Sequence, residues 1–453
     1  MSETSSWGTM MPGTGRALAT PPDAPPSPEL VTSKHYSREF AALTDTYTGD
    51  PIDVSFRQLV GPLPANEYTH GLYPYPARLL RHIPRFLLAT DAIVDGIDLV
   101  FDPFVGSGTV LLEAQLRGLA AVGVEQNPVA ALASRVKVLG AVPDNILTTL
   151  TRVLDEARRT RRKLVPSTAL ERWYSAGAFS ALARLASQVA AGAPEDRDLL
   201  ALCLALTARR VARTDPRIPV PVTSERNATA TSADVWKAWA SEAEAIARKL
   251  GSLPPSRPEA HVIQGDARNS AVWPNAEQAQ STLLLSSPPY GAAQKYVRST
   301  SLEAGWLGFA PHGRTIHIEH DSIGREHLSA ADKTVKLTQV WSDELRADLA
   351  LIAAKDHRRA AIYVTYFTDM QNVFQNARAR SVKRIALVTG TNNVVGGTLH
   401  TSQHLAAIVR ALGYRHTISL RDPIRGRSLL TARRNGTPSP SEYIDVFEVP
   451  DGA

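Results

Sequence analysis

Short apolar runs alternate with segments of helical periodicity along much of the chain. Each run is about as long as a strand buried on both faces of a parallel sheet, and each leads into a loop and a helical pattern. Repeated strand, loop and helix predict an open α/β sheet whose ligands bind beyond the carboxyl ends of the strands. The clearest runs cover residues 99–101, 121–124, 261–264, 282–285 and 384–389.

The last part of the chain has its own helical and strand patterns. Apolar residues from Ala360 to Ala377 recur on one helical face, which predicts a helix over about 345–380. A second helix is expected over 402–412, with Gly413 as its C-cap. Two late strands, 416–420 and 443–449, are expected to flank a basic loop at 425–434, which either contacts phosphate or is solvated.

Between about residues 142 and 253 the pattern is helical throughout, which predicts a helical domain inserted into the α/β core. This segment carries two clusters of basic residues, which are either solvated faces or contacts to a nucleic-acid backbone. The first cluster is Arg158, Arg159, Arg161, Arg162 and Lys163, and the second is Arg209, Arg210, Arg213, Arg217 and Arg226.

The composition narrows the classes of protein. Of 453 residues, 43% are hydrophobic and 21% charged, which is ordinary for a globular protein. We find no signal peptide and no apolar run near the roughly 20 residues that span a bilayer, so a cytoplasmic protein without a membrane partner is expected. The only cysteine, Cys203, excludes an internal disulfide and a cysteine-cluster metal site. The net charge of +6 permits a polyanionic partner.

Changes of composition and pattern divide the chain into four parts. A tail at 1–33, rich in Pro, Ser and Thr, is expected to be disordered because it buries too little apolar surface. The α/β core is expected at 34–140 and 258–453, around the helical insert at 141–257, a candidate for target recognition. An irregular segment at 292–335 is expected to be mobile and to face the substrate. Its histidines, which lack a firm metal-ligand spacing, are His312, His317 and His320.

The first candidate site is the glycine loop Asp102-Pro103-Phe104-Val105-Gly106-Ser107-Gly108-Thr109, between a strand and a helix. Its glycines let the backbone approach a ligand closely. The next apolar run ends in Glu125, which either accepts hydrogen bonds from both ribose hydroxyls of a ligand or caps the following helix. Asp266 follows the third run and either holds an adenine amino group or is a turn or N-cap aspartate.

The second candidate site is the loop Ser287-Pro288-Pro289-Tyr290 at the end of the run 282–285. It offers a hydroxyl, carbonyls without a competing proline N–H, and a flat stacking face, which suit a planar base with an exocyclic amine. Alone, this tetrapeptide fits a simple turn equally well. Upstream, Tyr75 lies in an aromatic and proline-rich segment, 69–78, that precedes a predicted helix at 79–88 and alone fits a core-packing turn.

Together, the two loops resemble the S-adenosylmethionine-dependent amino-methyltransferases of DNA, most closely the bacterial N4-cytosine group. Residues 104–108 are similar to that family's cofactor loop, 287–290 to its catalytic loop, and 75–78 to the element before the cofactor loop. Serine at position 287 is typical of the N4-cytosine enzymes. The segments 367–370 and 390–401 also look similar, and the resemblance spans about 66–430, thinly in the helical insert.

The resemblance implies a Rossmann-like seven-stranded methyltransferase sheet with an inserted helical domain. It implies S-adenosyl-L-methionine as cofactor and DNA as partner, and it raises a restriction endonuclease as a further candidate partner. Gly106 and Gly108 would approach the methionine moiety, Glu125 the ribose and Asp266 the adenine. The implied cofactor site also includes Tyr75, Asp102, Phe104 and Thr109.

The implied reaction is direct methyl transfer to an exocyclic amine of a base flipped out of the duplex. The amine would bond to the Ser287 hydroxyl and the Pro288 carbonyl while Tyr290 stacks on the base; Pro289 completes the loop. C5-cytosine methylation is disfavoured, because it needs a thiolate and Cys203 lies in an apolar helical run.

Three functions remain open from the sequence. The first is methyl transfer to N4 of cytosine in DNA. The same loop serves N6-adenine DNA methyltransferases and RNA amino-methyltransferases, in which aspartate or asparagine is more common at the position of Ser287. The third is a non-catalytic nucleic-acid-binding scaffold, which the two intact loops disfavour.

Overall fold

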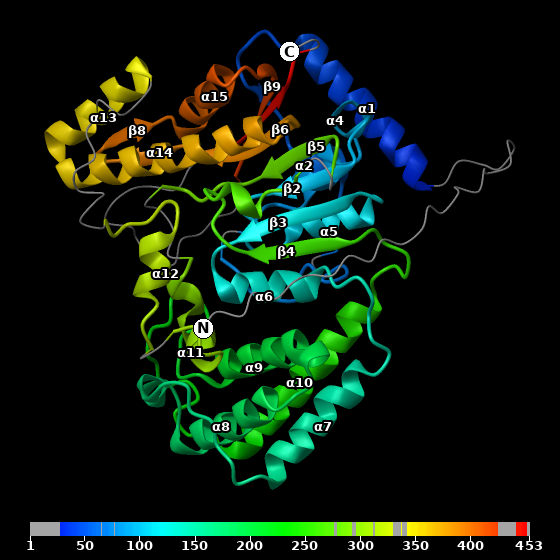
Figure 1. The fold of residues 1–453 in the computed structure, drawn as a ribbon, viewed down its shortest axis with the longest axis vertical. Coiled ribbons are helices and arrows are strands. Elements are labelled where there is room, and N and C mark those ends of the chain that lie inside the picture. The colour runs from blue at the N-terminus through cyan, green and yellow to red at the C-terminus, as the bar shows by residue number, and fades with distance from the viewer. Residues whose placement is uncertain are drawn as a thin grey trace, which may run out of the picture.

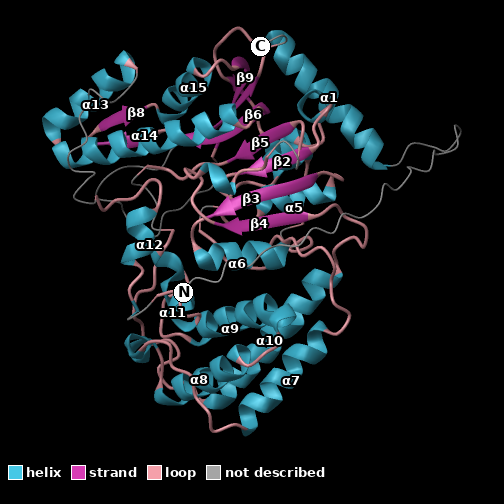
Figure 2. Ribbon diagram, in the orientation of Figure 1, coloured by secondary structure: helices cyan, strands magenta, loops and turns pink. Residues whose placement is uncertain are grey.

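The structure is a computed structural model that describes residues 28–64, 66–76, 78–275, 279–291, 296–310, 313–328, 337, 342–424 and 441–450. Within these ranges one sheet of eight strands has the order β1-β9-β10-β6-β5-β2-β3-β4 and helices lie on both sides of it (Figures 1 and 2). The strands are β1 (Ile52–Asp53), β2 (Leu99–Asp102), β3 (Ala120–Glu125), β4 (Ala260–Gln264), β5 (Thr282–Ser286), β6 (Val382–Gly390), β9 (Arg415–Pro423) and β10 (Ser441–Glu448).

The strand directions decide where a ligand site can form. Strands β2, β3, β4, β5 and β6 run parallel to one another, whereas β10 is antiparallel to both β6 and β9. The carboxyl ends of the parallel strands therefore meet at one edge of the sheet, and the start of β10 lies at the same edge. Among the described residues this sheet has one strand more than the predicted seven; β1 has only two residues and carries no periodic signal. A separate hairpin pairs β7 (Asn392–Val394) with β8 (Gly397–Leu399).

The apolar runs fill both faces of the sheet. In β5, Leu283 and Leu285 belong to one hydrophobic cluster and Leu284 to the other, because successive side chains of a strand point to opposite faces. Ala386 and Leu387 of β6 divide in the same way. The continuous apolar pattern thus follows from the burial of both faces, as expected for parallel strands covered by helices.

Two groups of helices cover the sheet. The first group shares one hydrophobic cluster with the sheet and comprises α1 (Pro28–Thr46), α2 (Phe56–Val60), α3 (His82–Leu87), α4 (Asp91–Val94), α5 (Thr109–Leu116) and α6 (Pro128–Lys137). The second group belongs to the other cluster and comprises α13 (Asp343–Lys355), α14 (His357–Ala379) and α15 (Thr401–Ala411). Throughout the described ranges, every helix is too short or too polar to cross a membrane.

Four longer helices lie between α6 and β4 in the sequence and together at the bottom of Figure 1, with α9 packed against α6. They are α7 (Ile146–Arg159), α8 (Ala176–Ala190), α9 (Arg197–Val211) and α10 (Ser232–Gly251). Most of the second basic cluster is neutralised within the chain by the ion pairs Arg209–Glu303, Arg210–Glu242, Arg213–Glu225 and Arg217–Asp215. The first cluster, in contrast, is exposed at the end of α7.

Several predicted boundaries need correction. Helix α1 begins at Pro28, inside the predicted tail at 1–33, and proline favours the first position of a helix. The helix predicted over 345–380 is two helices, because Asp356 is extended and its side chain accepts a hydrogen bond from Arg359 N to cap α14. The segment 292–335 is partly helical, with α11 (Ser301–Trp306) and α12 (Ile316–Asp321). The predicted basic loop at 425–434 lies outside the described residues.

Helix α6 ends in a buried amine beneath the glycine loop. Lys137 is 1% exposed and its Nζ has no hydrogen-bond partner among the described residues. A Cβ placed on Gly108 would lie 3.4 Å from Lys137 Cδ, so the lysine stem packs directly under the loop. Burial lowers the pKa of Lys137 from 10.5 to about 7.

We expect Lys137→Met to raise the free energy of unfolding by at least about 1 kcal/mol at pH 7, because an unpaired buried amine opposes folding. Between pH 7 and 10.5 the unfolded chain binds a proton that the folded chain does not, so wild-type stability rises with pH across this window. The advantage of the variant should therefore shrink towards pH 10, as urea denaturation across that range will measure. Lys249→Met, at a half-buried neighbour, is the control, and an equal gain there would contradict this account.

Candidate functional site

One pocket lies at the edge where the carboxyl ends of the parallel strands meet. The loops after β2, β3, β4 and β5 line it, together with parts of the segments 75–79, 296–298 and 319–327. Of the twelve predicted site residues, only Gly108 and Pro288 do not line the pocket, although their chain neighbours do. The other ten are Tyr75, Asp102, Phe104, Gly106, Thr109, Glu125, Asp266, Ser287, Pro289 and Tyr290.

The glycine loop depends on two left-handed backbone positions. Gly106 has φ +54° and Gly108, which precedes α5, has φ +76°. A Cβ on Gly106 would lie 3.4 Å from Cε1 of Tyr75, and a Cβ on Gly108 would lie 3.2 Å from Ser134. A side chain would therefore be strained at both positions and crowded at Gly108. The loop exposes backbone, rather than side chains, to the pocket at Gly106.

Glu125, at the end of β3, interacts with the glycine loop from the neighbouring strand. Its carboxylate accepts hydrogen bonds from the backbone N–H groups of Gly106 at 2.7 Å and Asn127 at 2.8 Å. The N-cap of α6 is Asn127, whose Oδ1 accepts from Val129 N at 3.1 Å, so Glu125 does not cap that helix. Burial raises the pKa of Glu125 to about 7. Its remaining lone pairs can accept hydrogen bonds from a ligand in the pocket.

Asp102 links the two loops. Its Oδ1 accepts hydrogen bonds from the Ser286 hydroxyl at 2.5 Å and from Phe104 N at 2.9 Å. Because Asp102 ends β2 and Ser286 ends β5, this contact ties together the ends of two adjacent strands immediately before both loops. The side chain is 2% exposed, and burial raises its pKa from 3.8 to about 7. The sequence patterns indicated Ser287 as a site residue but gave no role to Ser286, its neighbour in the Ser-Ser pair.

The Ser-Pro-Pro-Tyr loop is held at its far end by two donors. The carbonyl oxygen of Gly291 accepts hydrogen bonds from Tyr363 Oη and Asn392 Nδ2, both at 3.1 Å. A Cβ on Gly291 would lie 2.9 Å from the Tyr363 ring, so only glycine fits there. Pro288 is buried in the loop, while Ser287 and Tyr290 are half-buried at the pocket. No sequence pattern indicated Tyr363, whereas Asn392 lies in the segment 390–401 that resembled the family.

Other pocket residues come from segments with weak sequence patterns. Tyr296 stacks on Tyr75, with ring centroids 6.1 Å apart and planes 16° from parallel. Glu442 reaches the pocket because β10 starts at this edge of the sheet, which no local motif reveals. The same holds for Arg325, His327 and Glu319, from the segment after and within α12. Two parts of the segment 292–335, residues 296–298 and residues between 319 and 327, thus line the pocket.

The described residues contain no group of three or more His, Cys, Asp or Glu side chains arranged to hold a metal ion. His317 and His320 lie on α12, and His312 lies outside the described residues. Cys203 is fully buried in α9, and burial holds the pKa of its thiol well above the usual value. The side chains that line the pocket thus carry hydroxyl, carboxylate and aromatic groups, together with the guanidinium of Arg325 and the imidazole of His327.

A mixed α/β fold with a mostly parallel central sheet and a glycine loop after one strand fits a Rossmann-like methyltransferase. No protein-family model matches the chain. Over 81 residues the chain is 32% identical to the Type II methyltransferase M.MvaI of Kocuria varians, which is 18% of each protein. Over 72 residues it is 29% identical to the Type II methyltransferase M.MjaII of Methanocaldococcus jannaschii, which is 16% of this chain and 13% of that protein. The matches thus span less than a fifth of either relative.

We expect Asp102→Asn to change how stability depends on pH. The unfolded chain releases this proton near pH 3.8, whereas the folded chain retains it up to about pH 7. The contribution of Asp102 is therefore present below pH 3.8 and is lost as the pH rises through 7. Because asparagine does not titrate, wild-type stability should fall relative to the variant, by about 1 kcal/mol or more, between pH 4 and 8.

Urea denaturation of both proteins across this pH range measures the difference. Ser286→Ala serves as the matched variant, because it removes a hydrogen bond that lowers the pKa of Asp102. Its stability should fall more steeply with pH than that of the wild type. A wild-type curve parallel to that of Asp102→Asn would show that Asp102 is not retained as a neutral acid.

Proposed function

We propose that this chain is an S-adenosylmethionine-dependent DNA methyltransferase that modifies the exocyclic N4 amine of cytosine. The observation that carries the proposal is that the glycine loop and the Ser-Pro-Pro-Tyr loop, on the adjacent strands β2 and β5, line one pocket. The similarity to two Type II methyltransferases supports the transferase class. Serine at position 287 supports cytosine N4 over the amines of adenine.

The residues of the pocket fit such a cofactor. Gly106 keeps the loop free of a side chain beside Tyr75, so an extended ligand can lie against the backbone there. Glu125 keeps acceptor capacity for the two hydroxyls of a ribose, and Asp266 lines the pocket beyond β4, where it can accept from an adenine amino group. S-adenosylmethionine would supply an activated methyl group bound to sulfonium sulfur.

The Ser-Pro-Pro-Tyr loop can increase the reactivity of a weakly nucleophilic amine. The lone pair of the cytosine amine is delocalised into the ring, which makes the nitrogen a poor nucleophile. Hydrogen bonds from the amine to the Ser287 hydroxyl and the Pro288 carbonyl would draw the nitrogen towards tetrahedral geometry, and Tyr290 would stack on the base. These groups act by positioning alone, so no covalent bond between the chain and the base is required.

The target base of the DNA has to be flipped out of the duplex to enter this pocket, because a stacked base cannot reach a recessed loop. We propose the helices α7–α10, the predicted insert at 141–257, as a target-recognition domain. The exposed cluster at 158–163 supports contact with the phosphate backbone, since among the described residues only Arg158 of this cluster forms an ion pair, with Asp155. The Type II designation of the two relatives supports a restriction endonuclease as a functional partner.

Incubation of the protein with labelled S-adenosylmethionine and either duplex DNA or RNA should give N4-methylcytosine in DNA. Mass spectrometry of the released nucleosides identifies the product and separates the alternatives in one measurement. N6-methyladenine, or label in RNA alone, would replace the cytosine assignment. Cofactor binding without any product would favour the non-catalytic scaffold.

Ser287→Ala should lower kcat about 10- to 1000-fold, because one acceptor for the amine is lost in the transition state. The affinity for S-adenosylhomocysteine, measured by calorimetry, should remain nearly unchanged because Ser287 lies on the loop after β5 and not on the glycine loop. Ser281→Ala, just before the opposite end of β5, is the control and should retain activity. Equal losses of kcat and cofactor affinity in Ser287→Ala would contradict the role given to this hydroxyl.

A further inference from the structure

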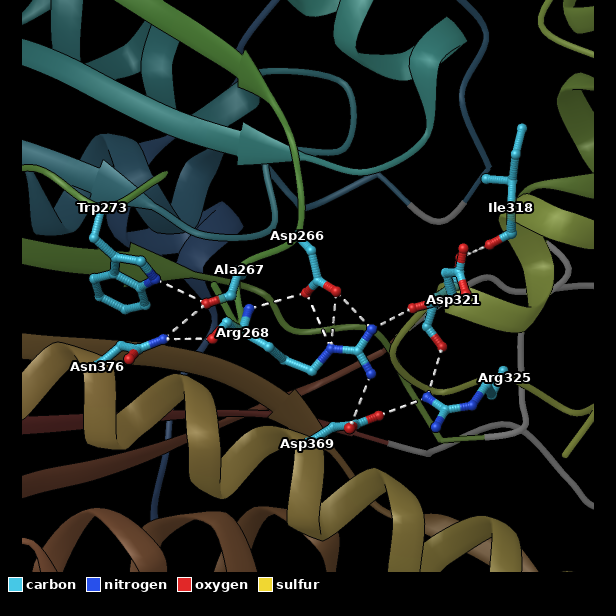
Figure 3. A network of polar contacts seen from close by, with 10 residues as sticks. Asp266, Ala267, Arg268, Trp273, Ile318, Asp321, Arg325, Asp369 and Asn376 are labelled. Atoms are coloured by element: carbon cyan, nitrogen blue, oxygen red, sulfur yellow. Dashed lines mark hydrogen bonds and ion pairs between the residues drawn. The ribbon is translucent and has the colours of Figure 1, made fainter. Parts of the chain in front are cut away.

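Asp369, on α14, lies between two arginines from different parts of the chain (Figure 3). Its Oδ1 accepts a hydrogen bond from Arg268 Nη1 at 3.0 Å, and its Oδ2 accepts one from Arg325 Nη1 at 2.6 Å. The side chains of Asp369 and Arg325 are only 10% and 7% exposed. Each carboxylate oxygen therefore serves a different arginine in a largely dry environment, where charge-assisted hydrogen bonds are strong.

Arg268 connects Asp369 to Asp266, on the side of the pocket beyond β4. Arg268 Nε contacts both carboxylate oxygens of Asp266 at 3.0 Å, Nη2 contacts Oδ2 at 2.6 Å, and the backbone N–H of Arg268 contacts Oδ1 at 2.9 Å. This arrangement fixes the plane of the Asp266 carboxylate. These four contacts come from three N–H donors, because Nε is shared by both oxygens, so of the about four lone-pair directions of the carboxylate one remains for a donor in the pocket.

Arg325 connects Asp369 to the Ser-Pro-Pro-Tyr loop. Arg325 lines the pocket and its Nη1 also donates to the carbonyl oxygen of Ser322 at 3.3 Å. Between these two residues, Gly324 has φ +78°, and a Cβ there would lie 3.0 Å from the carbonyl oxygen of Tyr290. Residues 322–325 therefore pack against the Ser-Pro-Pro-Tyr loop, and Asp369 fixes them there through Arg325.

A further contact of Arg268 connects it directly to the chain just before residues 322–325. Its Nη2 donates to the carbonyl oxygen of Asp321 at 2.6 Å, at the end of α12 and just before residues 322–325. The guanidinium thus divides its donors among Asp266, Asp369 and the Asp321 carbonyl (Figure 3). A ligand that donates a hydrogen bond to Asp266 changes how the donors of Arg268 are divided between Asp266 and its other two acceptors, Asp369 and the Asp321 carbonyl. These two acceptors position residues 322–325 beside the Ser-Pro-Pro-Tyr loop.

We propose that Asp369 is a positioning residue that couples the two ligands of the pocket, so that the cofactor facing Asp266 and the base facing Tyr290 each increase the affinity for the other. The inference rests on the proposed function and deepens it. Asp369 touches neither ligand; it acts through Arg268 on one side and Arg325 on the other. Because coupling between binding sites is reciprocal, measuring either affinity in the presence of the other ligand reports it.

The test is the dissociation constant of S-adenosylhomocysteine, measured by equilibrium dialysis with and without saturating PCR-amplified genomic DNA, which carries no methyl groups. For the wild type, DNA should lower this constant by roughly five-fold or more, the usual lower range of such coupling. In Asp369→Asn the ratio should fall to about one, because an amide offers one acceptor oxygen and cannot serve both arginines. Arg268→Gln should weaken cofactor binding itself, whereas Arg325→Gln should lower the ratio to about one.

Arg380→Gln is the matched control. Arg380, next to the end of α14, donates to the carbonyl oxygen of Ser270 and thus also ties this helix to the chain after β4, away from the pocket lining. The control should keep the wild-type ratio. A wild-type ratio in Asp369→Asn, or in Arg325→Gln where Asp369→Asn does not fold, would overturn the inference. A wild type that binds no S-adenosylhomocysteine would instead overturn the proposed function.

Discussion

The site depends on the hydrogen bond between Ser286 and Asp102, which joins the ends of two neighbouring parallel strands. Both loops begin immediately after these residues, so their relative position is set by the sheet rather than by the loops themselves. A rigid sheet edge is a precise support for reacting groups, because strand ends move less than loop tips. The far end of the Ser-Pro-Pro-Tyr loop is fixed independently, by Tyr363 and Asn392 at the Gly291 carbonyl.

Burial gives the site its electrostatic character. Asp102 and Glu125 lie close together at the ends of β2 and β3, and burial raises the pKa of each to about 7. Lys137, beneath the same loop, has its pKa lowered to a similar value by the same cause. Burial thus disfavours the charged form of each of these three side chains around the glycine loop.

Much of the core and of the pocket could be predicted from local sequence. The apolar runs predicted β2, β3, β4, β5 and β6, because parallel strands are buried on both faces. The residues that were predicted as site residues after β2, β3, β4 and β5 lie at the pocket. What local patterns could not show were contacts made through tertiary packing. Ser286 looks like any serine beside Ser287, and although Asp369 lies in the segment 367–370 that resembled the family, nothing in that segment indicated its contacts with Arg268 and Arg325. The break at Asp356 was missed because the helical periodicity continues across it.

The reversed direction of β10 has a consequence for how the chain tolerates shortening. This strand lies between β6 and β9, close to the C-terminus, and it brings Glu442 to the pocket. Its deletion would leave two unpaired strand edges in the middle of the sheet and would remove part of the pocket wall at the same time. Strand β10 is thus an integral part of both the sheet and the pocket wall, so removing it would disrupt the two together.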